Sequence, residues 1–207
     1  MPAVNATKFG LAGLAALLGM VIIMQASADT FSEVLSGRML DLHLVLELFA
    51  IVIAALVVTV SWHTFDRQRD SSANAMLADF VVVMGCDLMH ALTYEGMPLL
   101  LTESSTPQAI FFWLMGRSFE VLTLGAVALG LAPRLSRSVL LNIGLAGAVA
   151  IIAFGSYALD WFPSTFVAGE GVTSFKAGYE YALIALNGML ALLLWRKAMR
   201  EDSNQHA

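Results

Sequence analysis

Ionisable residues occur in pairs inside or at the ends of strongly apolar stretches of this chain. The pairs are His43 with Glu47, Asp87 with His90, Arg117 with Glu120, and Lys176 with Glu180. The members of each pair are three or four residues apart, so in a helix they share one face. A charged group is costly in hydrocarbon and normally faces a protein interior or a water-filled cavity. We therefore expect these side chains to face inward and to form one polar site.

The histidines and carboxylates of these pairs are side chains that bind metal ions. His43 and His90 supply imidazole nitrogens. Glu47 and Asp87 supply carboxylate oxygens, and together these donors suit Zn²⁺ or another divalent ion. Alternatively, the two histidines could ligate one haem iron, with the carboxylates outside the coordination sphere. Asp87 could also fix the tautomer of His90, because the two residues share a helix face.

The same charges can instead serve as contacts between helices. Arg117 can pair with Asp87 or with Glu120, and such a buried pair satisfies both charges while it holds two helices together. Lys176 stands at the end of its apolar stretch and can extend its amine to the lipid headgroups. The predicted ligand-binding set consists of the four pairs and of Trp113, one turn before Arg117.

The composition indicates an integral membrane protein. The chain has 207 residues, of which 58% are hydrophobic and 13% are charged, whereas a soluble domain carries about 25% charged residues. Six apolar stretches approach the ~20 residues that a helix needs to cross a bilayer. They are residues 9–27, 42–63, 74–92, 108–131, 137–159 and 176–195. None alternates with period two, so we expect an all-α bundle of six transmembrane helices in the lipid bilayer.

The basic residues predict the orientation of these spans. With the N-terminus inside, the inner side carries Lys8, Arg67, Arg69, Arg134, Arg137, Arg196, Lys197 and Arg200. The outer side carries only Arg38 and Lys176. We therefore expect both termini in the cytoplasm and the polar pairs in the outer half of the bundle.

The first apolar stretch has a second interpretation. Lys8, the apolar run after it and the small residues 26–28 also fit a secretory signal with its cleavage site. Removal of residues 1–28 would leave five spans in the same orientation. In either case we expect one transmembrane domain over residues 1–195 and a short cytoplasmic tail over residues 196–207.

Four ordered motifs carry a family resemblance. Residues 42–47 (LHLVLE) resemble an FHxxxE motif, and residues 87–97 (DLMHALTYEGM) resemble DLLHTLxYKGM. Residues 113–120 (WLMGRSFE) resemble LWIAARYLE, and residues 162–181 resemble FP…GLTPFK…EY. These motifs are those of the type-three membrane-associated sensor domain of bacteria, which the chain resembles over about residues 40–195.

The resemblance implies a sensory input module in the bacterial inner membrane. Members of this family precede histidine kinase, PAS or diguanylate cyclase domains, so it also implies such an output domain, in cis or in trans, and a homodimer. Three positions depart from the motifs, namely Leu42 for Phe, Glu95 for Lys and Ser174 for Pro. These departures bear on which ligand is bound, and the resemblance defines no ligand.

Three functions are compatible with the sequence. A sensor would bind a small ligand or cofactor in the outer half and move the last span. A metal- or haem-binding membrane protein would use His43 and His90 as ligands. A transporter of protons or solutes would relay protons through the carboxylates. Two observations count against a transporter: no inverted repeat is visible, and Asp79 is the one ionisable residue deep in the inner half, where a through-pathway should also be polar. We expect no enzyme, because no nucleophile stands with its base, and no nucleic-acid partner, because the basic residues do not cluster.

Overall fold

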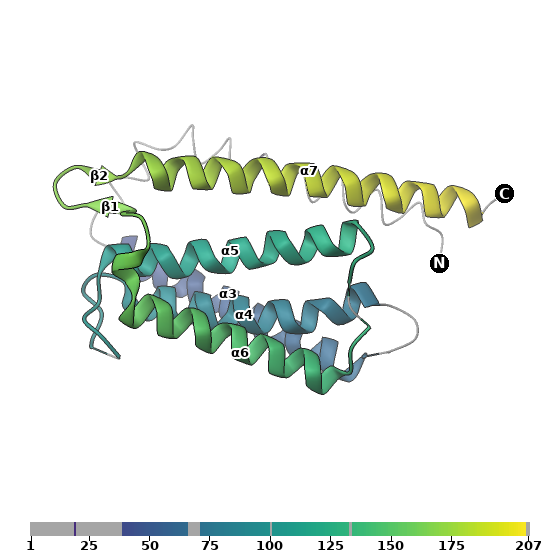
Figure 1. Cartoon of the computed structure of the whole chain (residues 1–207), viewed down its shortest axis with the longest axis horizontal. Coiled ribbons are helices and arrows are strands. Elements are labelled where there is room, and N and C mark those ends of the chain that lie inside the picture. The colour runs from purple at the N-terminus through teal and green to yellow at the C-terminus, as the bar shows by residue number, and fades with distance from the viewer. Residues whose placement is uncertain (1–18, 20–38, 66–70, 100, 133, 206–207) are drawn as a thin grey trace. The chain divides into compact units, whose positions relative to one another are not determined.

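The computed structural model describes residues 19, 39–65, 71–99, 101–132 and 134–205. Its long helices are α3 (Met39–His63), α4 (Ser71–Thr93), α5 (Thr106–Ala128), α6 (Arg137–Tyr157) and α7 (Ser174–Gln205). Between α6 and α7 lie a short 3₁₀ helix, η1 (Leu159–Trp161), and an antiparallel pair of two-residue strands, β1 (Phe166–Val167) and β2 (Gly171–Val172). Figure 1 shows these elements in chain order.

In the described part of the chain, five helices are long and apolar enough to cross a membrane, which confirms the prediction of an all-α transmembrane bundle. They coincide with the last five predicted spans, and α7 continues as a helix from its apolar part to Gln205. The first predicted span, 9–27, lies outside the described residues apart from Gly19. The predicted loop between the last two spans contains η1 and the β1–β2 hairpin, in which Gly169 and Gly171 have positive φ.

The chain divides into two compact units. One consists of 1–44 and 199–207, and the other of residues 45–198. The larger unit contains the packed bundle, in which α4 is the central helix because it packs along both α5 and α6. Within the apolar window of α4, 67% of the residues are buried, against 6% for α3. The polar side chains of α4 therefore lie in a protein interior, as the sequence predicts.

Two glycines allow α4 to approach its neighbours closely. A Cβ atom on Gly144 of α6 would lie only 2.7 Å from the carbonyl oxygen of Ala78 in α4. A Cβ atom on Gly116 of α5 would lie 3.1 Å from the Cβ of Cys86 in α4. Small residues at such crossings let helix backbones come together, which is the usual way in which membrane helices associate. The contact at Gly116 also brings the neighbouring Arg117 close to α4.

Helix α7 packs less extensively than α4. Only 11% of its apolar window is buried, and its buried residues Leu183 and Leu190 join Leu114 and Val121 of α5 in one hydrophobic cluster. Figure 1 shows α7 running alongside α5. A helix held by few buried contacts is one whose packing can change at small energetic cost.

Candidate functional site

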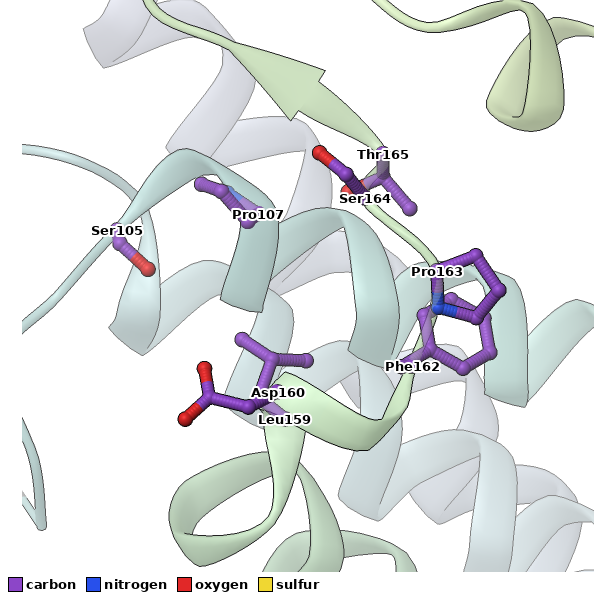
Figure 2. Close-up of a pocket in the computed structure, with 8 residues that line it drawn as sticks. All are labelled: Ser105, Pro107, Leu159, Asp160, Phe162, Pro163, Ser164 and Thr165. Atoms are coloured by element: carbon purple, nitrogen blue, oxygen red, sulfur yellow. The ribbon is translucent and has the colours of Figure 1, made fainter.

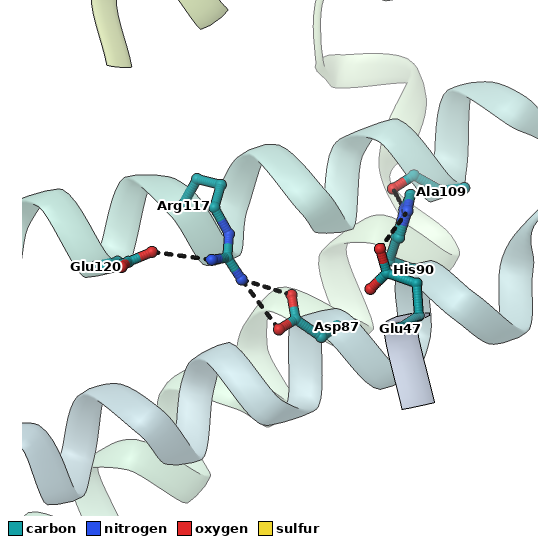
Figure 3. Close-up of polar contacts among 6 residues, drawn as sticks. All are labelled: Glu47, Asp87, His90, Ala109, Arg117 and Glu120. Carbon is teal, nitrogen blue, oxygen red and sulfur yellow. Dashed lines mark hydrogen bonds and ion pairs between the residues drawn. The ribbon is translucent and has the colours of Figure 1, made fainter. Parts of the chain in front are cut away.

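A charged network lies between α4 and α5. One guanidinium nitrogen of Arg117, Nη2, donates to both carboxylate oxygens of Asp87, at 2.8 and 3.0 Å, and Nη1 donates to Oε2 of Glu120 at 3.0 Å (Figure 3). The Asp87 side chain is 5% exposed, and the Arg117 side chain is 29% exposed. The sequence predicted that Arg117 would pair with Asp87 or with Glu120, and the structure shows both pairs. Arg117 therefore balances two carboxylates from two helices.

A second polar contact lies between α3 and α4. Oε1 of Glu47 lies 3.8 Å from Nε2 of His90, and both side chains are largely buried. The other ring nitrogen of His90, Nδ1, lies 2.7 Å from the carbonyl oxygen of Ala109 in α5 (Figure 3). His90 thus contacts α3 through Glu47 and α5 through Ala109. It lies one helical turn from Asp87, so the two polar contacts stand next to each other along α4.

The structure gives His90 and Asp87 different partners. Nδ1 of His90 lies 2.7 Å from the backbone carbonyl oxygen of Ala109, and both carboxylate oxygens of Asp87 accept from Arg117. The roles of Asp87 in orienting His90 and as a fourth metal donor stay predictions. A backbone carbonyl has no sequence signature, so the residues alone could not have revealed the Ala109 contact.

The remaining predicted residues lie on α3, α5 and α7. His43 is half-buried and stands one turn before Glu47 in α3, so helical spacing puts both side chains on one face. Lys176 and Glu180 form an ion pair of 2.8 Å with each other at the start of α7. Trp113 is half-buried and packs against the hydrophobic cluster between α5 and α7.

A comparison with protein families identifies the kind of domain that contains this site. A family model described as a membrane-associated sensor domain matches residues 35–207. This chain belongs to that family. The match covers all four motifs of the predicted resemblance and all of its polar pairs. Comparisons with curated proteins and with solved structures gave no significant match.

One departure of this sensor domain from the family motifs has a local explanation. Glu95, which stands where the motif has a lysine, accepts a hydrogen bond of 2.6 Å from the hydroxyl of Thr106, the first residue of α5. A carboxylate near a helix N-terminus is favoured by the free backbone N–H groups and the positive end of the helix dipole. The reversed charge thus supports the start of α5, and it lies apart from the Arg117 network.

A cavity of about 480 Å³ lies beside the first turn of α5 (Figure 2). It is lined by Ser105, Pro107, Leu159, Asp160, Phe162, Pro163, Ser164 and Thr165. The backbone N–H of Ala109 donates to the carbonyl oxygen of Ser105, and the carbonyl oxygen of Ala109 contacts His90. The turn of α5 that lines this cavity is therefore the turn that holds His90.

Two features of the sensor domain had no place in the predicted site. The hydroxyl of Ser118, next to Arg117, lies 2.7 Å from the hydroxyl of Tyr179 in α7. Asp79 in α4 is 1% exposed. Neither of its carboxylate oxygens makes a hydrogen bond of good geometry within the described part of the chain, although the Thr123 hydroxyl of α5 lies nearby. In the sequence, Asp79 stands out as an ionisable residue deep in the inner half of its predicted span. A tyrosine on a mainly apolar helix gives no comparable signal.

Proposed function

We propose that this sensor domain detects a small ligand or a cofactor at the polar site formed by α3, α4 and α5, and that α7 carries the resulting change to an output domain. The site comprises the Glu47–His90 contact and the Asp87–Arg117–Glu120 network. A ligand can act as a signal only if it binds one packing of the helices more tightly than another. The proposal therefore requires a polar group with two arrangements and a connection from that group to α7.

Arg117 meets the first requirement. Its guanidinium holds two carboxylates and remains partly exposed, so a ligand that adds or removes charge nearby would favour one partner over the other. An ion pair in a low-dielectric interior responds strongly to a neighbouring charge, because screening by water is weak there. The 480 Å³ cavity lies against the same turn of α5 that holds His90, so a bound molecule there would act on the same side chains.

The contact between Ser118 and Tyr179 meets the second requirement, and it is the observation that carries the proposal. Ser118 follows Arg117 directly in α5, and its hydroxyl also donates to the carbonyl oxygen of Leu114 at 2.6 Å. A shift of Arg117 along α4 would move Ser118 and therefore Tyr179. Because α7 has few other buried contacts, it can follow this movement.

The proposal also includes the setting of the domain in the cell. The positive-inside rule supports a bacterial inner-membrane position with both termini in the cytoplasm, so that the polar site faces outward and α7 leaves inward. Family membership supports a kinase or diguanylate cyclase output, in cis or in trans, and a homodimer in which two α7 helices report the change. The domain itself would bind and signal without catalysis.

Cysteine crosslinking along α7 tests this proposal. Cys86 is the single cysteine and is buried, so new cysteines at the exposed positions Met189, Leu192 and Trp195 can be crosslinked in a Cys86→Ala background. We expect crosslinks between two copies in membranes, with a position-dependent yield that changes when Asp87→Asn is added. Glu95→Gln is the matched control, because it removes an exposed carboxylate outside the network.

Two results would contradict the proposal. Identical crosslinking patterns with and without Asp87→Asn would show that α7 does not respond to the polar site. The absence of crosslinks at all three positions would contradict the proposed homodimer in which α7 reports the change.

A further inference from the structure

The contact of His90 with Ala109 decides which ring nitrogen carries the proton. A carbonyl oxygen only accepts hydrogen bonds, so Nδ1 of His90, 2.7 Å from it, must donate. In the neutral imidazole, Nε2 then carries the lone pair. An Nδ1–H bonded to a backbone carbonyl is the arrangement that orients metal-binding histidines and makes the other nitrogen a better donor.

The lone pair of Nε2 faces a carboxylate. Oε1 of Glu47 lies 3.8 Å from Nε2 of His90, and the side chains are 17% and 9% exposed. Two electron-rich atoms that face each other in a dry interior need a positive charge between them, either a proton on Nε2 or a metal ion. A charge-assisted hydrogen bond would bring the two atoms to about 2.7–2.9 Å. The observed separation is almost 1 Å longer, so it does not fit a proton well.

The separation fits a metal ion better. With metal–ligand bonds of about 2.0–2.2 Å, two ligands on a tetrahedral Zn²⁺ ion lie about 3.4 Å apart. Glu47 and His90 reach this separation with a movement of a few tenths of an ångström, within the range of a rotamer adjustment.

We propose that Glu47 and His90 bind one first-row divalent transition metal ion, with Zn²⁺ as the reference ion. One imidazole and one carboxylate leave coordination positions for water or for an external ligand, as in zinc sites that bind exogenous molecules. Imidazole nitrogen favours Zn²⁺, Ni²⁺ or Cu²⁺ over Mg²⁺ or Ca²⁺, which prefer oxygen. This inference rests on the proposed function and names the cofactor class of the same site.

The geometry favours a single ion over the haem that the sequence left open. A haem iron on Nε2 of His90 would place the porphyrin plane about 2 Å from that nitrogen and perpendicular to the iron–nitrogen bond. The Glu47 carboxylate lies 3.8 Å from Nε2, close enough to compete with a macrocycle for the space around that nitrogen. A compact ion needs no such space.

Metal binding to the full chain in lipid nanodiscs tests the inference. The protein is stripped with a chelator and titrated with Co²⁺, whose visible absorption reports its ligand geometry, and Zn²⁺ then competes for the site. We expect one equivalent of Co²⁺, displaced by one equivalent of Zn²⁺. Glu47→Gln preserves the side-chain shape but removes the charged donor, and we expect it to weaken binding at least tenfold, as His90→Ala does.

His63→Ala is the matched control, because His63 is an exposed histidine at the other end of α3. It should bind Co²⁺ as tightly as the unaltered chain. The inference is overturned if the unaltered chain takes up no stoichiometric Co²⁺ or Zn²⁺, or if Glu47→Gln binds as tightly as His63→Ala.

The two proposals fail in different ways. A chain that binds no metal but whose α7 crosslinks still change with Asp87→Asn would overturn the metal site and leave the sensor function with another ligand. A chain that binds one metal ion at Glu47 and His90 while α7 stays unchanged would support the metal site and contradict the relay.

Discussion

Asp87→Asn removes the charge of the carboxylate that holds Arg117 between α4 and α5. Breaking a fully buried ion pair costs about 3–5 kcal/mol, because the remaining charge is left without compensation. The Arg117 side chain is 29% exposed and keeps its bond to Glu120 at 3.0 Å, so the cost falls below that range. We expect the free energy of unfolding to fall by about 2–3 kcal/mol, since one charged partner remains.

Thermal unfolding of the detergent-purified protein measures this loss. For a chain of this size, 1 kcal/mol shifts the midpoint by about 2–4 °C, so Asp87→Asn should lower it by about 5–10 °C. Glu120→Gln removes a carboxylate that is 32% exposed and makes a single bond to Arg117. It should cost no more than about 1 kcal/mol, because exposed ion pairs contribute little.

A double substitution separates the loss of an ion pair from the loss of packing. Asp87→Leu with Arg117→Met removes both charges and keeps apolar volume, and such replacements of buried pairs are often neutral. We therefore expect the double variant to be more stable than Asp87→Asn alone. The reasoning is refuted if Asp87→Asn unfolds within 1–2 °C of Glu120→Gln, a difference of about 1 kcal/mol at most.

Three further predictions concern Gly144, Asp79 and Tyr179. Gly144→Ala should lower the free energy of unfolding by about 1–3 kcal/mol in the same assay, because the new Cβ would lie 2.7 Å from the α4 backbone. Gly188→Ala is the control and should be neutral or stabilising, because no atom lies within 4 Å of its new Cβ. Asp79→Asn should change the free energy of unfolding by less than about 1 kcal/mol, because the amide has nearly the same shape and the carboxylate oxygens make no hydrogen bond within the described residues. A loss as large as that of Asp87→Asn would show that Asp79 is charged and paired. Tyr179→Phe removes the hydroxyl that lies 2.7 Å from the Ser118 hydroxyl. It should lower the free energy of unfolding by about 0.5–1 kcal/mol, while circular dichroism shows that α7 remains helical. An unchanged unfolding midpoint would show that this hydrogen bond contributes nothing.

The helices could be predicted from the sequence because a bilayer imposes a length on apolar stretches. The stretches around α3 to α7 stand out in hydropathy, and their ends are marked by charges and by residues such as Pro107 in the first turn of α5. The β1–β2 hairpin was missed because two-residue strands leave no periodic pattern. It forms where Gly169 and Gly171 allow positive φ.

The site could be predicted only as a set of inward-facing residues. Spacing along single helices placed Asp87 with His90 on one face, and the hydrocarbon setting required Arg117 to find a partner. Which residues meet across helices depends on the depth and rotation of each helix, and those follow from close contacts such as that at Gly116. The backbone contact of Ala109 and the partnership of Ser118 with Tyr179 depend on this packing, so no sequence pattern reveals them.

The most direct test of the account measures whether the Arg117 network controls the position of α7 through Tyr179. Spin labels at Leu129, just after α5, and Leu192 in α7, both largely exposed, report the distance between the two helices in nanodiscs. The account predicts that Asp87→Asn shifts this distance distribution and that the shift disappears when Tyr179→Phe is added. Equal distributions in the unaltered chain and in Asp87→Asn, or a shift that persists without the Tyr179 hydroxyl, would contradict it.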